Sequence, residues 1–557
     1  MRFFKYLLFP LTALALLSLN CSDSNNHLDN NRVVVGISSD IETVNPLYAF
    51  SVTESYITDQ IFLPLIHHTW NSELGEIESE PMLAESWKWN SDSTSINIVL
   101  RKDVKWTDGM PVTAEDVVYS FDIYSDPAVE SRFFGLFKNF YLEENQHIDL
   151  TRSFNIISKN ELKINFLPDR AVSLFAIDLP VLPKHIFNKI DRNKIKNAEI
   201  NFKPVSDGAF IFYKWDKDQS VILKADQNSF LFNKNGIDEL IFKIIPDYNS
   251  RLLQLQNSEI DIMTDIRPND VSTVKSKEDL KIVPVKGNEY DYFGWSNIDL
   301  VEFNKSHKKV PNKLFGSIKV RQALTYALNR DEVIKNYLEN RGEIAVGPIA
   351  PIFKSIYDST LIPYEYNPEK AKKLLAEEGW TPSNKDGTLE KDGLRFSINL
   401  NIATGNPGRE FAAQIYKNNL KAIGIEVNIE KQETGSFFQK AFSNQFNAWI
   451  AGWVVPIPIE LKSYWNSDLK QAPFNLTGYG NPEVDSLLNE MDKRIPRQKR
   501  IKIFRRIQKI LHHDQPVSFL YWKDNVVAYN SRINNIQITP IGPIYDCQKW
   551  EIKKIKD

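Results

Sequence analysis

The chain has 557 residues, of which 42% are hydrophobic and 12% are aromatic, so it is long and apolar enough to bury the cores of two or more domains. Its formal net charge of -3 leaves no broad basic field and excludes nucleic acid as a partner. It contains only 2 cysteines, Cys21 and Cys547, which are too few for a disulfide framework.

The first 21 residues have the pattern of an export signal. Two basic residues precede an apolar run over 6–19, which is shorter than the ~20 apolar residues needed to span a hydrocarbon core. The segment resembles a bacterial lipoprotein signal, which implies that Cys21 carries lipid and that 22–32 form a polar tether. The alternatives are a soluble periplasmic protein, in which Cys21 is incidental, and a permanent membrane helix, which is the weaker interpretation.

Turn signals and helical spacing define the next elements. The dipeptide Asp108-Gly109 predicts a tight hairpin turn, and Thr113 is placed to cap a helix that begins at Ala114. Over 320–328, apolar residues recur three and four positions apart, which predicts a helix with one apolar stripe.

Strand, helix and strand patterns follow one another between 394 and 429. Apolar residues alternate over 394–402 and 425–429, and a helical pattern over 409–422 separates them. This order predicts a βαβ unit with parallel strands and a right-handed crossover. Helical spacing returns over 501–511, and Pro516 predicts its end. These elements indicate the α/β class.

The segment from 81 to 120 contains the most specific motifs in the chain. They are PMLAESW at 81–87, VKWTDG at 104–109 and PVTAEDVVYS at 111–120, followed by LPKHI at 182–186, PVSDGAF at 204–210, VRQALTYALNR at 320–330 and GYGNPEVD at 478–485. Together they resemble the extracellular solute-binding proteins, family 5, that serve peptide and nickel ABC importers. The resemblance extends over about 33–550.

This resemblance implies an α/β fold of two lobes, the type II periplasmic-binding-protein clamshell, with an extra subdomain in the first lobe. Lobe I is expected to comprise 33–77, 200–297 and 516–557, the extra subdomain 78–199, and lobe II 298–515. Closure about a hinge would enclose a ligand, and a peptide would lie extended between the lobes. The implied partners are a peptide or other small solute, an ABC permease complex in the inner membrane, and a lipid membrane reached through Cys21. A monomer in the periplasm or cell envelope is expected.

The resemblance also places the ligand near particular residues. The predicted ligand-binding residues are Phe50, Ser51, Glu54, Trp295, Asn297, Thr404, Trp453, Trp465 and Tyr479. The alternative for Glu54 is a first-turn carboxylate at a helix N-terminus, and the alternative for Trp295 is a place in the core. Thr404 follows a predicted parallel strand at its carboxyl end, where ligands collect in α/β sheets.

One position departs from the peptide-binding pattern. Peptide-binding members often have an Asp three residues after the position of Trp453, and it pairs with the amino terminus of the peptide. This chain has Pro456 there, which offers neither charge nor donor. A buried ammonium then needs another partner, and Glu54 and Glu460 are the candidates. The alternative ligands in the family are nickel chelates, sugars and modified peptides.

Catalytic motifs are missing from the sequence. The pairs His67-His68 and His512-His513 belong to no HExxH or CxxC arrangement, and there is no G-x-S-x-G elbow, phosphate loop or Rossmann fingerprint. The chain is therefore predicted to be no enzyme and to hold no metal or cofactor. The alternative from another class is a tethered sensor or adhesin that binds a large partner on its outer surface.

Overall fold

The computed structural model describes residues 31–382 and 386–553. The predicted export signal, the predicted lipid attachment at Cys21 and most of the tether therefore lie outside the described residues. Among the described residues, no helix combines the length and the apolar character needed to cross a bilayer.

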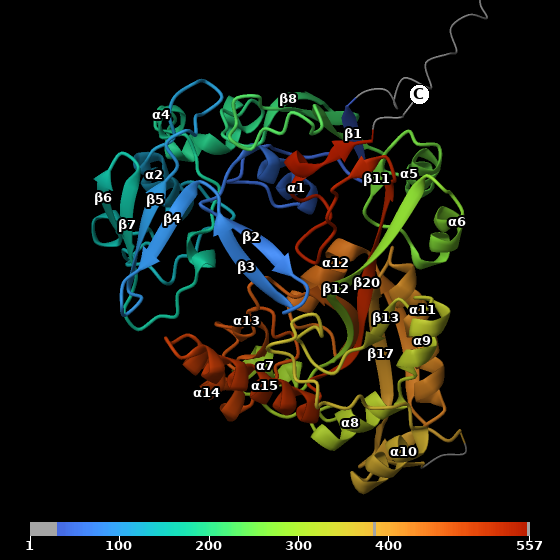
Figure 1. Cartoon of the computed structure of the whole chain (residues 1–557). Coiled ribbons are helices and arrows are strands. Elements are labelled where there is room, and N and C mark those ends of the chain that lie inside the picture. The colour runs from blue at the N-terminus through green and yellow to red at the C-terminus, as the bar shows by residue number, and fades with distance from the viewer. Residues whose placement is uncertain (1–30, 383–385, 554–557) are drawn as a thin grey trace, which may run out of the picture.

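One mixed sheet of eleven strands runs through both halves of the molecule (Figure 1). Its order is β18-β17-β19-β12-β20-β11-β1-β10-β9-β8, and β13 pairs with β20. In chain order, the bounds are β1 (Arg32–Ile37), β8 (Phe210–Asp216), β9 (Ser220–Ala225), β10 (Glu239–Ile244), β11 (Ile262–Met263), β12 (Leu280–Trp295), β13 (Gly342–Ile344), β17 (Ser397–Ala403), β18 (Glu426–Gln432), β19 (Ala448–Val454) and β20 (Val517–Asn530). Parallel and antiparallel pairs both occur, and the α/β class is confirmed.

Two long strands, β12 and β20, connect the two halves of the molecule (Figure 1). They pair antiparallel, and their register is irregular between Lys286 and Tyr290. Val285 packs in the core of the first half, whereas Tyr290 packs in the core of the second. The chain therefore passes between the lobes at this irregularity. The predicted boundaries, 297/298 and 515/516, fall just beyond the lobe II ends of the same two strands.

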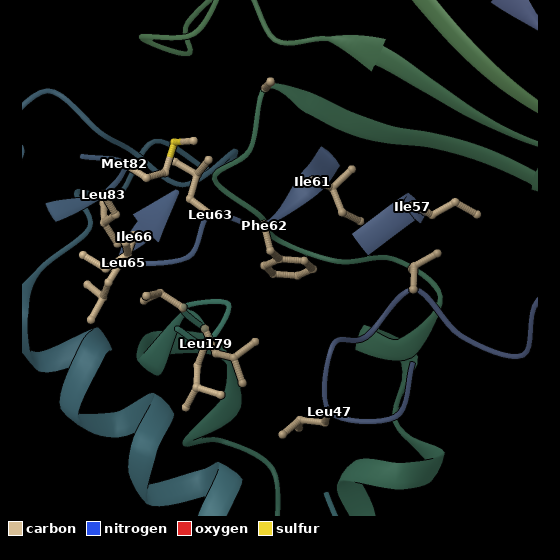
Figure 2. Packing of buried hydrophobic residues seen from close by; sticks show 14 of the residues in the cluster. Leu47, Ile57, Ile61, Phe62, Leu63, Leu65, Ile66, Met82, Leu83 and Leu179 are labelled. Carbon is tan, nitrogen blue, oxygen red and sulfur yellow. The ribbon is translucent and has the colours of Figure 1, made fainter. Parts of the chain in front are cut away.

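Lobe I and the extra subdomain share one hydrophobic core. In Figure 2, Ile57 and Ile61 come from lobe I, Met82 and Leu179 from the subdomain segment, and Phe62 lies between them. Lobe I also contains α1 (Val52–Ile61), β2 (Ile66–Asn71), β3 (Glu76–Pro81), α5 (Tyr248–Gln256), α6 (Val271–Lys275), β21 (Ile533–Asn534) and β22 (Glu551–Ile552). The segment predicted as the subdomain contains a separate sheet with the order β4-β5-β7-β6. Its elements are β4 (Ala84–Trp89), β5 (Ser95–Leu100), α2 (Ala114–Ser125), α3 (Leu150–Ser153), β6 (Phe154–Ser158), β7 (Glu161–Asn165) and α4 (Lys184–Phe187).

Lobe II packs helices on both faces of its part of the sheet. Successive residues of β12 point to opposite faces, so Tyr292 packs in one core and Phe293 in another. The helices are α7 (Leu300–Ser306), α8 (Ile318–Ala327), α9 (Arg330–Asn336), α10 (Pro368–Glu377), α11 (Pro407–Lys421), α12 (Thr434–Phe442), α13 (Lys462–Trp465), α14 (Pro482–Met491) and α15 (Arg497–Asp514), and the short strands are β14 (Thr381–Pro382), β15 (Leu389–Lys391) and β16 (Leu394–Arg395).

Most of the elements predicted from the sequence are present. The βαβ unit is β17, α11 and β18, with β17 and β18 parallel. Its first strand begins at Ser397, so the predicted start at 394 is wrong, because Leu394 and Arg395 pair with β15 instead. The predicted helices over 320–328 and 501–511 correspond to α8 and α15. At the predicted turn, Gly109 has a φ of 86°, a conformation that glycine tolerates.

Candidate functional site

Three adjoining cavities lie where the lobes meet, and Ile457 lines all of them. The subdomain cavity, of about 450 Å³, lies between the extra subdomain and lobe II and is lined by Arg170 and Phe504 among others. The lobe I cavity, of about 400 Å³, is lined by Asp59 and its neighbours. The hinge cavity, also of about 400 Å³, lies beside Val285 of β12.

Polar contacts join the two lobes around the subdomain cavity. The Lys354 ammonium of lobe II donates to the carbonyl of Ser72 at 2.8 Å, in the turn between β2 and β3. The Arg494 guanidinium donates to the carbonyl of Ser93 at 2.9 Å and also contacts the carbonyl of Asp92. The lobes therefore touch away from the crossing strands, which is a closed arrangement.

The hinge cavity has mainly apolar walls. Val52 and Tyr56 of α1 face Val455, Pro456 and Ile457 across it. Pro456, which stands where an Asp was expected, is thus in the cavity wall but provides no charge for a ligand.

The lobe I cavity is lined by both acidic and basic side chains. Asp59 of α1, Arg132, Asp178 and the pair His67 and His68 all line it. The Nε2 atom of His68 lies 3.2 Å from an Asp178 carboxylate oxygen. His68 also stacks on Phe175, with 3.9 Å between the ring centroids. On the same wall, the Nε2 atom of His67 lies 3.2 Å from a carboxylate oxygen of Asp546.

Asp59 differs from the other carboxylates of this cavity. Its side chain has solvent-accessible surface, but this surface faces the cavity, where protein atoms surround it. Burial raises the pKa of Asp59 to about 7, against the attraction of Arg132 and with some help from Asp178. Within the described part of the chain, no hydrogen bond reaches the Asp59 carboxylate.

Trp453 is the penultimate residue of the strand β19 and is half-buried. It lies parallel to Tyr292 with 6.2 Å between ring centroids, and it meets Tyr464 and Phe474 edge-on at 5.2 and 5.5 Å. The residues that follow it, Val454 to Ile457, form the wall of the hinge cavity. Trp453 is therefore next to the cavities but does not line them.

Trp465 and Tyr479 belong to a core of lobe II. Their side chains are 5% and 3% exposed. The Tyr479 hydroxyl donates to Asp514 at 2.7 Å, and burial together with Asp514 raises the pKa of Tyr479 far above its usual value. Neither residue lines any of the three cavities.

Phe50, Ser51 and Glu54 begin the helix α1. Phe50 is 72% exposed. Ser51 and Glu54 form a capping box, in which each side chain accepts the backbone N–H of the other, at 3.1 and 2.8 Å. The second Glu54 oxygen accepts the N–H of Glu42. The Glu54 carboxylate is thus buried and serves the backbone, as Glu460 does at the start of α13.

Trp295 and Asn297 lie at the end of β12 and do not line the three cavities. Trp295 is fully buried and stacks on Phe293 at 3.9 Å. The Asn297 amide donates to the carbonyls of Trp295 and Pro516 at 2.8 and 2.9 Å, so it ties β12 to the start of β20. Thr404 is exposed in the loop between β17 and α11, away from the other predicted residues.

Sequence reasoning did not single out Asp59, Arg132 or Asp178 as site residues. Asp59 lies on a short helix with the ordinary pattern of a solvated acidic residue, so its spacing carries no signal. The pair His67-His68 belongs to no catalytic or metal-binding motif, and the structure pairs both rings with carboxylates. Among the described residues, no cluster of His, Cys, Asp and Glu is arranged to hold a metal ion.

Four charged side chains meet where the lobes join. Asp291 of β12 is 2% exposed and accepts from Arg409 of α11 at 2.9 Å. Lys523 of β20 lies 2.5 Å from Glu289 and 3.5 Å from Asp291. Burial by itself raises the pKa of Asp291, but Lys523 and Arg409 together hold it below its usual value. These residues form the crossing-strand ion cluster.

Comparison with known proteins assigns the chain to a family. The family model of the bacterial extracellular solute-binding proteins, family 5, matches residues 78–473. The chain belongs to this family. The family-5 chain is 29% identical to the oligopeptide-binding protein AppA of Bacillus subtilis, over 94% of this chain and 92% of that protein. It is 27% identical to heme-binding protein A of Haemophilus influenzae, over 79% of this chain and 78% of that one.

Solved structures agree with the family assignment. The structure of Bacillus subtilis AppA in complex with a nonapeptide aligns with this family-5 chain at a TM-score of 0.73 and 28% identity. The alignment covers 94% of this chain and 99% of AppA. The family and the two-lobed α/β fold that the motifs predicted are confirmed.

Proposed function

We propose that this protein is the solute-binding component of an ABC importer and that it captures peptides between its lobes. One observation carries the proposal: three adjoining cavities meet at Ile457, and their walls come from both lobes. Such a series of cavities suits an extended ligand better than a compact one. The nonapeptide bound to the related AppA supports the same class of ligand.

To deliver a peptide, the protein must differ in shape between its ligand-free and ligand-bound states, so that a permease can distinguish them. A ligand that touches both lobes favours the closed form, because only that form offers all of its contacts. The closed outer surface would then be the signal read by a permease in the inner membrane. Export by the segment 1–21 and lipid attachment at Cys21 belong to this proposal, and they would keep the protein beside its permease.

Native mass spectrometry of the protein purified from its producing cell tests the proposal. Heterogeneous peptides released on denaturation are the expected result. The variant Ile457→Arg, which puts a charge where the cavities meet, should retain none, whereas the matched variant Val301→Arg, at a side chain 80% exposed on α7, should retain them. A wild-type protein that carries no peptide and gives no thermal shift with a peptide library would refute the proposal and favour a sensor or adhesin.

A further inference from the structure

The lobe I cavity combines apolar walls with an excess of negative charge. Three carboxylates, Asp59, Asp178 and Asp546, line it, whereas Arg132 is the one permanent cation among its lining residues in the described chain. Arg132 is already engaged, because its guanidinium donates to Ser55 at 3.1 Å and to the carbonyl of Ala49. The cavity is therefore suited to a cation.

The three carboxylates differ in the partners they have. Asp546 accepts from Gln548 and Lys549 at 3.1 and 2.7 Å and faces His67, so its charge is compensated. Asp178 faces His68, but its other oxygen is buried without any hydrogen bond. Asp59 accepts no hydrogen bond in the described structure.

One nitrogen of a buried histidine ring beside these carboxylates lacks a hydrogen-bond partner, whereas the Nδ1 atom of the same ring, His68, lies 3.1 Å from the Ser79 hydroxyl. His68 is 8% exposed and lines the cavity, and its Nε2 atom makes no hydrogen bond although it is close to Asp178. Buried polar atoms are rarely left without a partner unless a ligand or water completes them. Two features therefore lie in the same cavity: the unsatisfied atoms of the His68–Asp178 pair, and the Asp59 carboxylate, which Arg132 attracts but which accepts no hydrogen bond.

We propose that the lobe I cavity binds a primary ammonium group of the peptide, with Asp59 as its counter-ion and Asp178 as the second acceptor. This inference rests on the proposed function and deepens it. It also provides the charge that Pro456 does not, since Ile457, the next residue, forms part of the same cavity wall. Phe133 and Phe175 line the cavity as well, so the carbon atoms next to the ammonium would meet aromatic rings.

The ammonium can come from the amino terminus or from a lysine side chain. Four peptide pools, from dipeptides to nonapeptides, distinguish these sources: lysine-free or lysine-containing, each with a free or an acetylated amino terminus. Retained peptides are identified by native mass spectrometry and their affinities are measured by calorimetry. The variants are Asp59→Asn and Asp178→Asn, and Asp103→Asn, at an exposed carboxylate outside the cavities, is the control with the same loss of charge.

If the amino terminus is the source, lysine-free peptides bind with a free amino terminus and lose affinity on acetylation, by about tenfold or more. If lysine is the source, acetylated peptides that contain lysine still bind. Asp59→Asn weakens the ammonium-bearing peptides to a similar degree in either case, and Asp103→Asn does not. Asp178→Asn repeats the test should Asp59→Asn disturb folding.

Two results would overturn the inference, and they can be told apart. Acetylated, lysine-free peptides that bind as tightly as free ones, together with unchanged affinity in both variants, would show that peptides bind without this site. The proposed function would then stand alone. If no pool binds the wild-type protein, the proposed function fails and this inference fails with it.

Discussion

Asp59 shows how one position can bind a ligand well and stabilise the empty protein poorly. Its carboxylate is surrounded by protein but has no hydrogen-bond donor, and burial raises its pKa to about 7. The unfolded chain has the ordinary Asp value of 3.8, so the folded protein holds an extra proton between 3.8 and about 7. The free energy of unfolding therefore falls as the pH rises through this window.

The variant Asp59→Asn should remove this pH-dependent penalty. At pH 8 its free energy of unfolding is expected to exceed that of the wild type by on the order of 1 kcal/mol, a value that allows for screening by solvent in the cavity. At pH 5 the difference should shrink, because the wild-type carboxyl is then protonated in the folded state. Urea unfolding at both pH values measures this, with Asp103→Asn as the control. A variant less stable than the wild type at pH 8 would contradict the prediction.

The aromatic residues show how far the sequence could predict the site. Trp453 and Pro456 lie at or beside the cavities, as their place after a predicted strand indicated. Trp295, Trp465 and Tyr479 are buried instead, because lobe II helices and neighbouring rings cover them. The local sequence around a strand end is similar whether its aromatic residue lies beside a cavity or in a core. Only tertiary packing distinguishes the two cases.

Asp59 could not be predicted for a related reason. On α1 it is simply an acidic residue among polar neighbours. Its environment depends on Arg132 and Asp178, which come from the subdomain segment. A spacing argument within one helix contains none of this information.

Among the elements, β12 and β20 are the two long strands that connect the lobes. They cross between the lobes at the irregular register after Lys286, and the crossing-strand ion cluster lies there. The cluster ties both strands to α11 through Arg409. Burying four charges is tolerable only because each has a partner of opposite sign.

Asp291→Asn should therefore be strongly destabilising. Removing the central carboxylate leaves Arg409 and Lys523 with only Glu289 to compensate them, at a cost of about 3 kcal/mol in the free energy of unfolding. Glu483→Gln is the matched control, since its pair with Arg506 is half exposed and screened by solvent, so its loss should cost far less. Because the pKa of Asp291 is held low in the fold, its contribution persists above the unfolded value of 3.8 and is lost at lower pH. Urea unfolding near neutral pH measures the free energy of unfolding of both variants, and an equal decrease in the two would contradict the prediction.

The elements themselves were predicted better than their ends. Long periodic segments such as α15 and the βαβ unit were identified, because the spacing of their hydrophobic residues is visible in the sequence. The motif at 320–330 did not reveal a break, yet α8 ends at Ala327 and Asn329 caps a new helix, α9. Turns of this kind depend on what each helix packs against.

At the scale of the whole molecule, closure depends on contacts that the lobes make far from the crossing strands. The double variant Lys354→Ala/Arg494→Ala removes hydrogen bonds that join the lobes around the subdomain cavity. It should bind peptide about tenfold more weakly, because the closed form loses about 1–2 kcal/mol while no cavity-lining residue changes.

Calorimetry measures this loss of affinity, and small-angle scattering with and without peptide measures compaction. The control is Lys196→Ala, which removes an exposed ion pair with Glu130 that does not join the lobes. Its affinity should match the wild type. Unchanged affinity in the double variant would mean that these contacts do not hold the closed form.

The family motifs predicted the two-lobed shape and the α/β class. They did not locate the crossing point, which the structure places between Val285 and Tyr290 rather than after Asn297. The reason is physical: β12 is one continuous strand of 16 residues, so no turn or change in composition signals that its neighbours change from one lobe to the other.

The order of strands also decides when each lobe can be completed during synthesis. Lobe II is built mainly from one contiguous stretch, whereas the first strand, β1, pairs with β10 and β11, and β11 pairs in turn with the late strand β20. The guanidinium of Arg532 donates to the carbonyl of Arg32 across 500 residues of chain. A ribosome therefore releases nearly the entire polypeptide before lobe I can close its sheet. Until then the part of lobe I already made lacks the last strand of its sheet, so lobe I is completed only at the end of synthesis.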